Sequence, residues 1–297
     1  MSATDAVAVG GLHPASAPQR ARTPGRAIIW FLFPAAFLLV VVLVVPLCAT
    51  VWLSLSPNVL INFPGHGVAN YSYLLGKAYY QGVMLRTLRL AAEVTFFAVL
   101  IGYPAALAMR TLSARASTML ALAMTLPVLS GPLVVILGFM ILLSDGGPML
   151  QPLQSLGLPR LRLLGSEAGI VIGIVHFVLP FVIMSLASLL RGIPDTVIEA
   201  ARSLGASPWQ RFRRIIWPLS LPGVLSAMII AFSLSTGSFI APHYLGGVAD
   251  LTLTTLVTQF MMATFNGQLA ATASVILLVV LTAVIFLSTV LISRRIR

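Results

Sequence analysis

Ionisable side chains are rare in this chain of 297 residues, which has seven acidic residues and four histidines. Glu93 is an acid inside a long apolar stretch, and such a group is a functional candidate because burying its charge is costly. Its carboxylate would suit a cationic solute. Arg89 lies four residues earlier on the same helical face, so a purely structural ion pair is the alternative interpretation.

His176 stands in a second apolar stretch. In that setting a histidine is more often a hydrogen-bonded packing residue than a ligand. No cysteine or acid lies at a metal-ligand spacing from it, so the sequence predicts no metal site. An intramembrane protease would need a serine paired with a base such as His176, and no motif supports that pair. The sequence therefore predicts no catalytic residue.

Further polar candidates gather near residue 240. Ser235 and Thr236 belong to a cluster of hydroxyls in an apolar stretch, where small polar residues usually mediate helix packing and less often line a pathway. His243 and Tyr244 follow just beyond this stretch. They are candidates for contact with a solute or with a protein that delivers one.

The segment 191–218 is polar and predicts two short helices joined by a turn. Thr196 with Glu199 three residues later is a capping-box pattern that predicts the start of the first helix. Gly205 is suited to the left-handed position that ends a helix. The segment also carries five of the chain's arginines, so its surface is cationic.

The second helix of this segment is predicted to begin at Ser207, with Pro208 at its first position and Gln210 at its third. Pro218 is predicted to end it. A rigid cationic helix pair is more structure than a connection between two apolar stretches requires. We therefore expect it to bind a partner.

The composition of the chain indicates that these candidate residues are held by membrane-spanning helices. Hydrophobic residues make up 59% of the chain and charged residues 8%, against about 25% charged in a typical soluble domain. A soluble enzyme is excluded, because a soluble fold of this length needs far more polar surface. A membrane-spanning helix needs about 20 apolar residues. Six stretches qualify, at about 28–53, 88–109, 118–143, 168–190, 219–241 and 269–292.

The fold class that follows is an all-α polytopic membrane protein with six transmembrane helices, short interfacial helices and the helix pair of 191–218. The third stretch is interrupted by Pro127, Gly131 and Pro132. Such breaks are tolerated where neighbouring helices satisfy the freed backbone groups. Residues 250–265 predict a short helix that begins at Asp250.

The net charge of +11 indicates topology. With both termini in the cytoplasm, the inside segments hold 13 basic residues and the outside segments 5. No run of basic residues with interleaved aromatics stands apart from the membrane flanks, so no nucleic-acid partner is predicted. Residues 1–26 are predicted to be a disordered cytoplasmic tail, and residues 27–297 a single six-span domain.

Six positions of the segment 191–218 carry a resemblance to a known family. The spacing resembles the EAA loop of the permease subunits of binding-protein-dependent ABC importers, with Trp217 where that family usually has leucine. The matching positions are Glu199, Ala200, Ala201, Gly205, Ile215 and Pro218.

The resemblance implies a mechanism and a set of partners. The loop would fit a groove on a cytoplasmic ATPase, so that nucleotide-driven closure moves the membrane helices. Ala200 and Ala201 would allow close approach, Gly205 would make the turn, and Glu199 would fix the loop or pair with a cation of the ATPase. For Glu199 the alternative is a capping role alone. The implied assembly has two ATPase subunits, a second and different permease, an extracytoplasmic binding protein and membrane lipid.

This chain is not expected to be an enzyme. Its single lysine, Lys77, is not part of a phosphate-binding loop of the G-x-x-x-x-G-K-[ST] type. No cofactor is predicted in it, and the resemblance places ATP and Mg²⁺ in the partner ATPase. The resemblance further implies the bacterial cytoplasmic (inner) membrane, with the chain crossing several times.

The segments Gly102–Pro104, Leu179–Phe181 and Phe239–Gly247 are similar to those of the spermidine/putrescine-type subgroup, which implies a polyamine as the solute. Related permeases take opines, aminophosphonates or ferric iron, and these remain alternatives. An ion-coupled secondary transporter is the alternative of a different class. It should show inverted repeats and paired charges at the membrane midplane, and the sequence shows neither.

Overall fold

The computed structural model describes residues 26–63, 65–155 and 162–296. All regular elements in these ranges are helical, apart from an isolated bridge between Asn58 and Phe63. Among the described residues, five helices are long and apolar enough to cross a membrane, or six if a sharply bent pair is one span. The predicted all-α membrane fold is confirmed. The predicted tail lies outside the described residues, except for Arg26.

The helices that form the spans differ in their bounds from the predicted stretches. They are α1 (Arg26–Ser54), α3 (Ala78–Thr111), α4 (Ala114–Leu129) with α5 (Pro132–Leu143), α7 (Glu167–Arg191), α10 (Trp217–Thr236) and α13 (Gly267–Ile296). The short elements are a 3₁₀ turn (Val59–Ile61), α2 (Ala69–Gly76), α6 (Leu150–Ser155), α8 (Asp195–Ser203), α9 (Pro208–Arg211), a π-helix (Phe212–Ile216), α11 (Ile240–Leu245) and α12 (Leu253–Met262).

The chain divides into two compact units, Met1–Cys48 and Ala49–Arg297. In the first unit the described residues belong to α1, whose apolar side chains are exposed from Phe37 to Val45. All contacts discussed below lie within the second unit.

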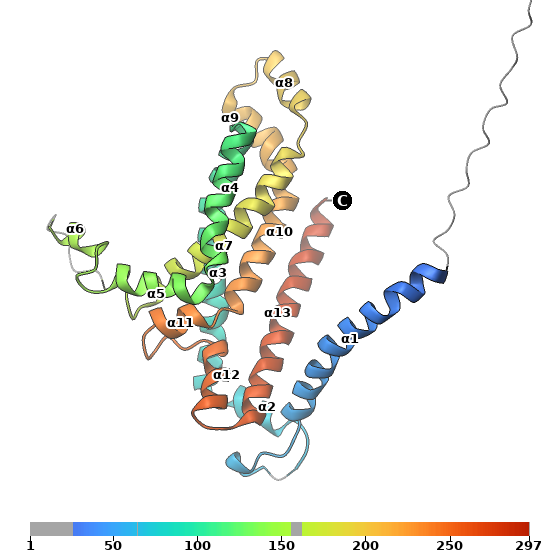
Figure 1. The fold of residues 1–297 in the computed structure, drawn as a ribbon, viewed down its shortest axis with the longest axis vertical. Helices are drawn as coiled ribbons and strands as arrows, with labels where there is room; N and C mark the ends of the chain where they lie inside the picture. The colour runs from blue at the N-terminus through green and yellow to red at the C-terminus, as the bar shows by residue number, and fades with distance from the viewer. Residues whose placement is uncertain (1–25, 64, 156–161, 297) are drawn as a thin grey trace, which may run out of the picture. The chain divides into compact units, whose positions relative to one another are not determined.

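The core of the second unit is formed by α3, α7 and α10, which pack against one another, with α3 mostly behind α4 and α7 in the view of Figure 1. Their buried side chains are aliphatic and small, so the helices approach closely. Gly102 of α3 shows this, because a Cβ atom there would lie 2.8 Å from Cγ1 of Val182. The core includes Leu90, Val94 and Ala98 from α3, Ile174, Val178 and Val182 from α7, and Val224, Ala227 and Ala231 from α10.

The third predicted span is broken. α4 and α5 meet at an angle of 92°, with Ser130 and Gly131 between them. Gly131 has φ = +81°, a left-handed conformation that glycine adopts without steric cost. Pro132 then begins α5 at a position where its missing N–H is not needed.

The fifth span is longer than predicted, because the helix runs from Pro208 to Thr236. The prediction that Pro218 ends the second loop helix is wrong. A π-turn precedes the proline, and the N–H of Trp217 bonds the carbonyl of Phe212, five residues earlier. The wider turn carries the helix past the residue that cannot donate. The second loop helix and the fifth span are therefore one continuous unit.

The predicted short helix of 250–265 begins later than expected. Thr252 caps α12 through a capping box with Thr255. Asp250 instead accepts a hydrogen bond of 3.0 Å from the N–H of Gly247. The carboxylate therefore stabilises the turn that precedes the helix.

Candidate functional site

The first helix of the loop, α8, begins at Asp195, with Pro194 as its N-cap residue and no side-chain cap. The predicted capping box of Thr196 and Glu199 is therefore wrong. Asp195 occupies the first turn, where a carboxylate complements the helix dipole. The side chain of Glu199 is exposed and makes no hydrogen bond or ion pair with another described residue. The capping interpretation of Glu199 thus loses its support.

The turn and the start of the second helix follow the prediction. Gly205 has φ = +79°, and the N–H of Ala206 donates to the carbonyl of Ala201 at 3.0 Å, which closes the end of α8. Ser207 and Gln210 form a complete capping box at the start of α9. The loop is therefore a defined helix pair.

An arginine at the end of α3 fixes the start of α8. Nη2 of Arg110 donates to Oδ1 of Asp195 at 2.6 Å and to the carbonyl of Ile193 at 2.9 Å. Arg110 is largely buried, with 11% of its side chain exposed, whereas Asp195 is 84% exposed. Arg191 at the end of α7 donates to the hydroxyl of Ser117 in α4. The first loop helix is thus joined directly to the spans.

An aromatic cluster fixes the second loop helix. The ring of Tyr103 in α3 lies 5.3 Å from the ring of Trp217 and 6.1 Å from that of Phe212, in edge-to-face geometry. Trp209 stacks on Phe212 at 5.5 Å. The hydroxyl groups of Tyr103 and Ser220 are 2.8 Å apart and both residues are buried. The second loop helix therefore packs directly on α3 and α10.

The outward surface of the loop carries apolar side chains that the described chain does not cover. Leu204 is 88% exposed and Trp209 65%. Val197 and Ala200 are also exposed, whereas Ala201 and Ile215 are half-buried. Exposed apolar side chains beside arginines are typical of a protein-binding surface.

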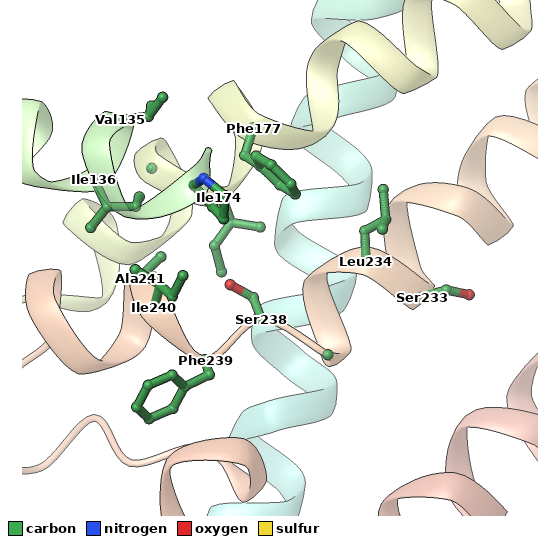
Figure 2. Close-up of a pocket in the computed structure, with 13 residues that line it drawn as sticks. Val135, Ile136, Ile174, Phe177, Ser233, Leu234, Ser238, Phe239, Ile240 and Ala241 are labelled. Carbon is green, nitrogen blue, oxygen red and sulfur yellow. The ribbon is translucent and has the colours of Figure 1, made fainter. Parts of the chain in front are cut away.

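The cavity drawn in Figure 2 has a volume of about 450 Å³ and lies where two helix breaks meet. Pro132 lines it from the first break, and Gly237 and Ser238 line it from the break between α10 and α11. Irregular backbone at membrane depth occurs where it lines a cavity or is buried in protein. In Figure 2 the hydroxyl of Ser238 points toward Ile174, and the remaining walls are mostly apolar.

Ser235 and Thr236 lie next to this cavity in sequence but do not line it. Both are buried, and their hydroxyls donate to carbonyls of their own helix, at 2.6 Å from Ser235 to Ala231 and 2.7 Å from Thr236 to Phe232. Their contacts are those of packing residues. His243 and Tyr244 are exposed on α11, and His243 stacks on Phe239 at 5.0 Å.

A second cavity, of about 630 Å³, brings Glu93 and His176 together between α3, α5 and α7. Glu93 accepts a hydrogen bond of 2.8 Å from Nε of Arg89, so the expected ion pair is present. Glu167, at the start of α7, also lines this cavity, with its Oε1 3.7 Å from the same Nε. Sequence analysis missed Glu167, because only the packing of α7 on α3 places it beside Glu93.

Within the described ranges, no group of three or more histidine, cysteine or acidic residues could hold a metal ion. The polar groups of the second cavity are instead two carboxylates, one guanidinium and one imidazole. This arrangement can bind an organic cation by charge and hydrogen bonding.

Comparison with protein families gives one match over most of the chain. The sequence model described as "Binding-protein-dependent transport system inner membrane component" matches residues 98–297. This range contains the loop, all spans after α3, and the lining of both cavities apart from Arg89, Glu93 and Phe97.

Curated relatives carry several solute names. The spermidine/putrescine transport system permease protein PotB of Haemophilus influenzae is 29% identical over 221 residues, covering 74% of this chain and 77% of its own. PotB of Escherichia coli is 29% identical over 214 residues, covering 71% and 78%. The molybdenum transport system permease protein ModB of Azotobacter vinelandii is 33% identical, covering 59% and 76%.

Solved structures share the fold. A chain of a bacterial alginate ABC transporter, crystallised with an alginate-bound periplasmic protein, superposes with a TM-score of 0.76 at 17% identity. The match covers 91% of this chain and 94% of that chain. A chain of the MetNI methionine ABC transporter gives a TM-score of 0.57 at 20% identity, covering 76% and 98%.

Proposed function

Since this chain belongs to the family of binding-protein-dependent transport system inner membrane components, we propose that it is the permease subunit of an ABC importer for polyamines. Family membership makes it a transport subunit and not an enzyme, as predicted. The polyamine substrate is supported by the relatives named for spermidine and putrescine transport and by the carboxylates of the second cavity.

The fixation of the loop to the spans carries the coupling part of this proposal. Residues 191–218 would bind a cytoplasmic ATPase through α8 and the exposed surface around Leu204 and Trp209. Arg110 and Tyr103 join the two loop helices to α3. A movement of the ATPase would therefore move the spans instead of bending the loop.

Within this proposal the six loop positions have different roles. Glu199 is free to pair with a cation on the ATPase, Ala200 and Ala201 allow close approach, and Gly205 makes the turn. Ile215 and Pro218 lie in the continuous helix that passes the movement to α10. ATP and Mg²⁺ are bound by the ATPase partner and not by this chain.

The assembly would contain two ATPases, a second permease and an extracytoplasmic binding protein. Both termini and residues 191–218 would face the cytoplasm of a bacterial cell, in accordance with the distribution of arginines. The start of α7 and the segment between α11 and α12 would then lie at the outer side.

Reconstitution tests this function. The chain is co-expressed with an ATPase, a second permease and a binding protein of the same transport system, and the complex is placed in ATP-loaded proteoliposomes. We expect uptake of labelled spermidine or putrescine that requires both ATP and the binding protein. Uptake of neither polyamine, while another solute is imported with ATP, would contradict the proposed substrate.

A further inference from the structure

The face of α3 and α7 around the 630 Å³ cavity has polar groups where an exposed surface in the membrane is normally apolar. The exposed fractions of the side chains are 66% for Arg89, 32% for Glu93 and 29% for Glu167. His176 is also exposed. In a bilayer such groups face water or protein and not lipid, because the cost of burying charge in hydrocarbon is high. A position of this face against the hydrocarbon of the bilayer would therefore be costly.

The charges at the mouth of the cavity do not balance. Two carboxylates, of Glu93 and Glu167, share the single guanidinium of Arg89. Arg89 donates a hydrogen bond to Glu93, whereas the buried Oε1 of Glu167 accepts none from any described residue. The cluster thus has a net charge of −1 and an acceptor without a donor, which costs free energy unless a cation binds.

The rest of the cavity suits a chain of methylene groups. Its wall runs along α7 from Glu167 to Leu179, about 18 Å at 1.5 Å per residue. Away from the carboxylates, the cavity is lined by Val171, Val175, Phe97 and Phe139. Aliphatic side chains pack against methylene groups, and aromatic faces attract ammonium groups.

We propose that this cavity is the outer binding site for the transported cation, and that Arg89 occupies in the empty transporter the position that a substrate ammonium group takes. The inference rests on the proposed polyamine importer. An ammonium group that binds Glu167 and Glu93 displaces the guanidinium, which swings toward the outer solution. The substrate methylenes then lie along the wall toward His176.

Cation selectivity at a cysteine placed in the cavity tests this inference. Ala168 is exposed and lines the cavity next to Glu167. The probe chain carries Ala168→Cys, with Cys48, the single native cysteine, replaced by serine. The full complex in nanodiscs is treated with a trimethylammonium or a sulfonate methanethiosulfonate reagent, and modification of this chain is followed by mass spectrometry.

We expect the cationic reagent to react faster than the anionic one by about tenfold beyond their ratio for a free thiol. Glu167→Gln should abolish this preference, and Arg89→Gln should increase it. Arg86→Gln is the matched control, because Arg86 lies one turn away on α3 and does not line the cavity. Spermidine should slow modification in the probe chain and less so with Glu167→Gln.

Two results would overturn the inference. A preference that is unchanged by Glu167→Gln and Arg89→Gln would show that these charges do not select the ligand. No reaction with either reagent would show that the face is covered by protein. If the cation preference follows the charges but the complex does not import polyamines, the cation site stands and the proposed substrate fails.

Discussion

Arg110, at the end of α3, donates a hydrogen bond of 2.6 Å to Asp195, the first residue of α8, across 85 residues of sequence. The same guanidinium holds the carbonyl of Ile193. This contact fixes where the first loop helix begins, and it joins that helix to a span of the core.

Arg110→Gln should therefore uncouple ATP hydrolysis from uptake. Asp195 is 84% exposed, so the loss of the ion pair itself should cost less than about 1 kcal/mol of stability. We expect the number of solutes imported per ATP to fall several-fold while the complex still assembles. The comparison is Arg115→Gln, at the start of α4. An unchanged ratio of uptake to hydrolysis would show that the contact between Arg110 and Asp195 does not act in coupling.

Tyr103→Phe and Tyr103→Ala separate the hydroxyl from the ring. The phenylalanine variant loses the hydrogen bond to Ser220, which in a membrane protein is worth about 0.6 kcal/mol. The phenylalanine variant should unfold at a slightly lower denaturant concentration and should retain uptake. The alanine variant also loses the edge-to-face contacts with Phe212 and Trp217. Its free energy of unfolding should fall by about 3 kcal/mol or more.

The readout for this pair is uptake together with unfolding in sodium dodecyl sulfate. Coupling should fail in the alanine variant alone. If both variants transport like the unaltered protein, the aromatic cluster does not transmit movement to α3.

Glu199→Ala should abolish most ATP-driven uptake without unfolding the chain, because Glu199 is exposed and has no partner among the described residues. Ser203→Ala, on the same helix, serves as the control and should retain uptake. The pair is measured in proteoliposomes with equal amounts of assembled complex. Normal uptake with Glu199→Ala would show that this side chain does not act in coupling.

Substitution of buried amides at the end of the spans away from the loop 191–218 should affect stability and not coupling. Asn58 donates to Asn266 at 2.9 Å and to Asn70 at 3.1 Å, and all three residues are at most 3% exposed. Asn266→Ala removes the donor to Oδ1 of Asn58 and the acceptor of the Leu269 N–H, and should cost about 1–3 kcal/mol. Gln259→Ala, on exposed α12 surface, should cost little.

This prediction is checked by the unfolding midpoint of the purified chain and by the ratio of uptake to ATP hydrolysis. A normal midpoint for Asn266→Ala would show that the network does not stabilise the fold. A changed ratio of uptake to ATP hydrolysis at a normal unfolding midpoint would show that the amide network acts in coupling and not in stability.

Local signals predicted the parts of the site that depend on neighbouring residues. Gly205 takes the left-handed turn, and Ser207 with Gln210 caps the second helix, because these devices act over a few residues. The expected pair of Arg89 and Glu93 also forms, since it spans one helical turn.

Features set by tertiary contact were missed or wrong. Arg110 binds Asp195 and so moves the helix start away from Thr196. The π-turn before Pro218 lets one helix continue where proline predicts an end. Glu167 joins Glu93 only through the packing of α7 against α3, which no spacing in the sequence encodes.

Site-specific photocrosslinking in the assembled transporter tests the central claim most directly. A benzophenone side chain is placed at Leu204, 88% exposed on the loop, or at Val248, 98% exposed between α11 and α12. We expect position 204 to crosslink to the ATPase and position 248 to the binding protein. Crosslinks from position 204 to the binding protein, or from position 248 to the ATPase, would contradict the proposed orientation and the role of the loop.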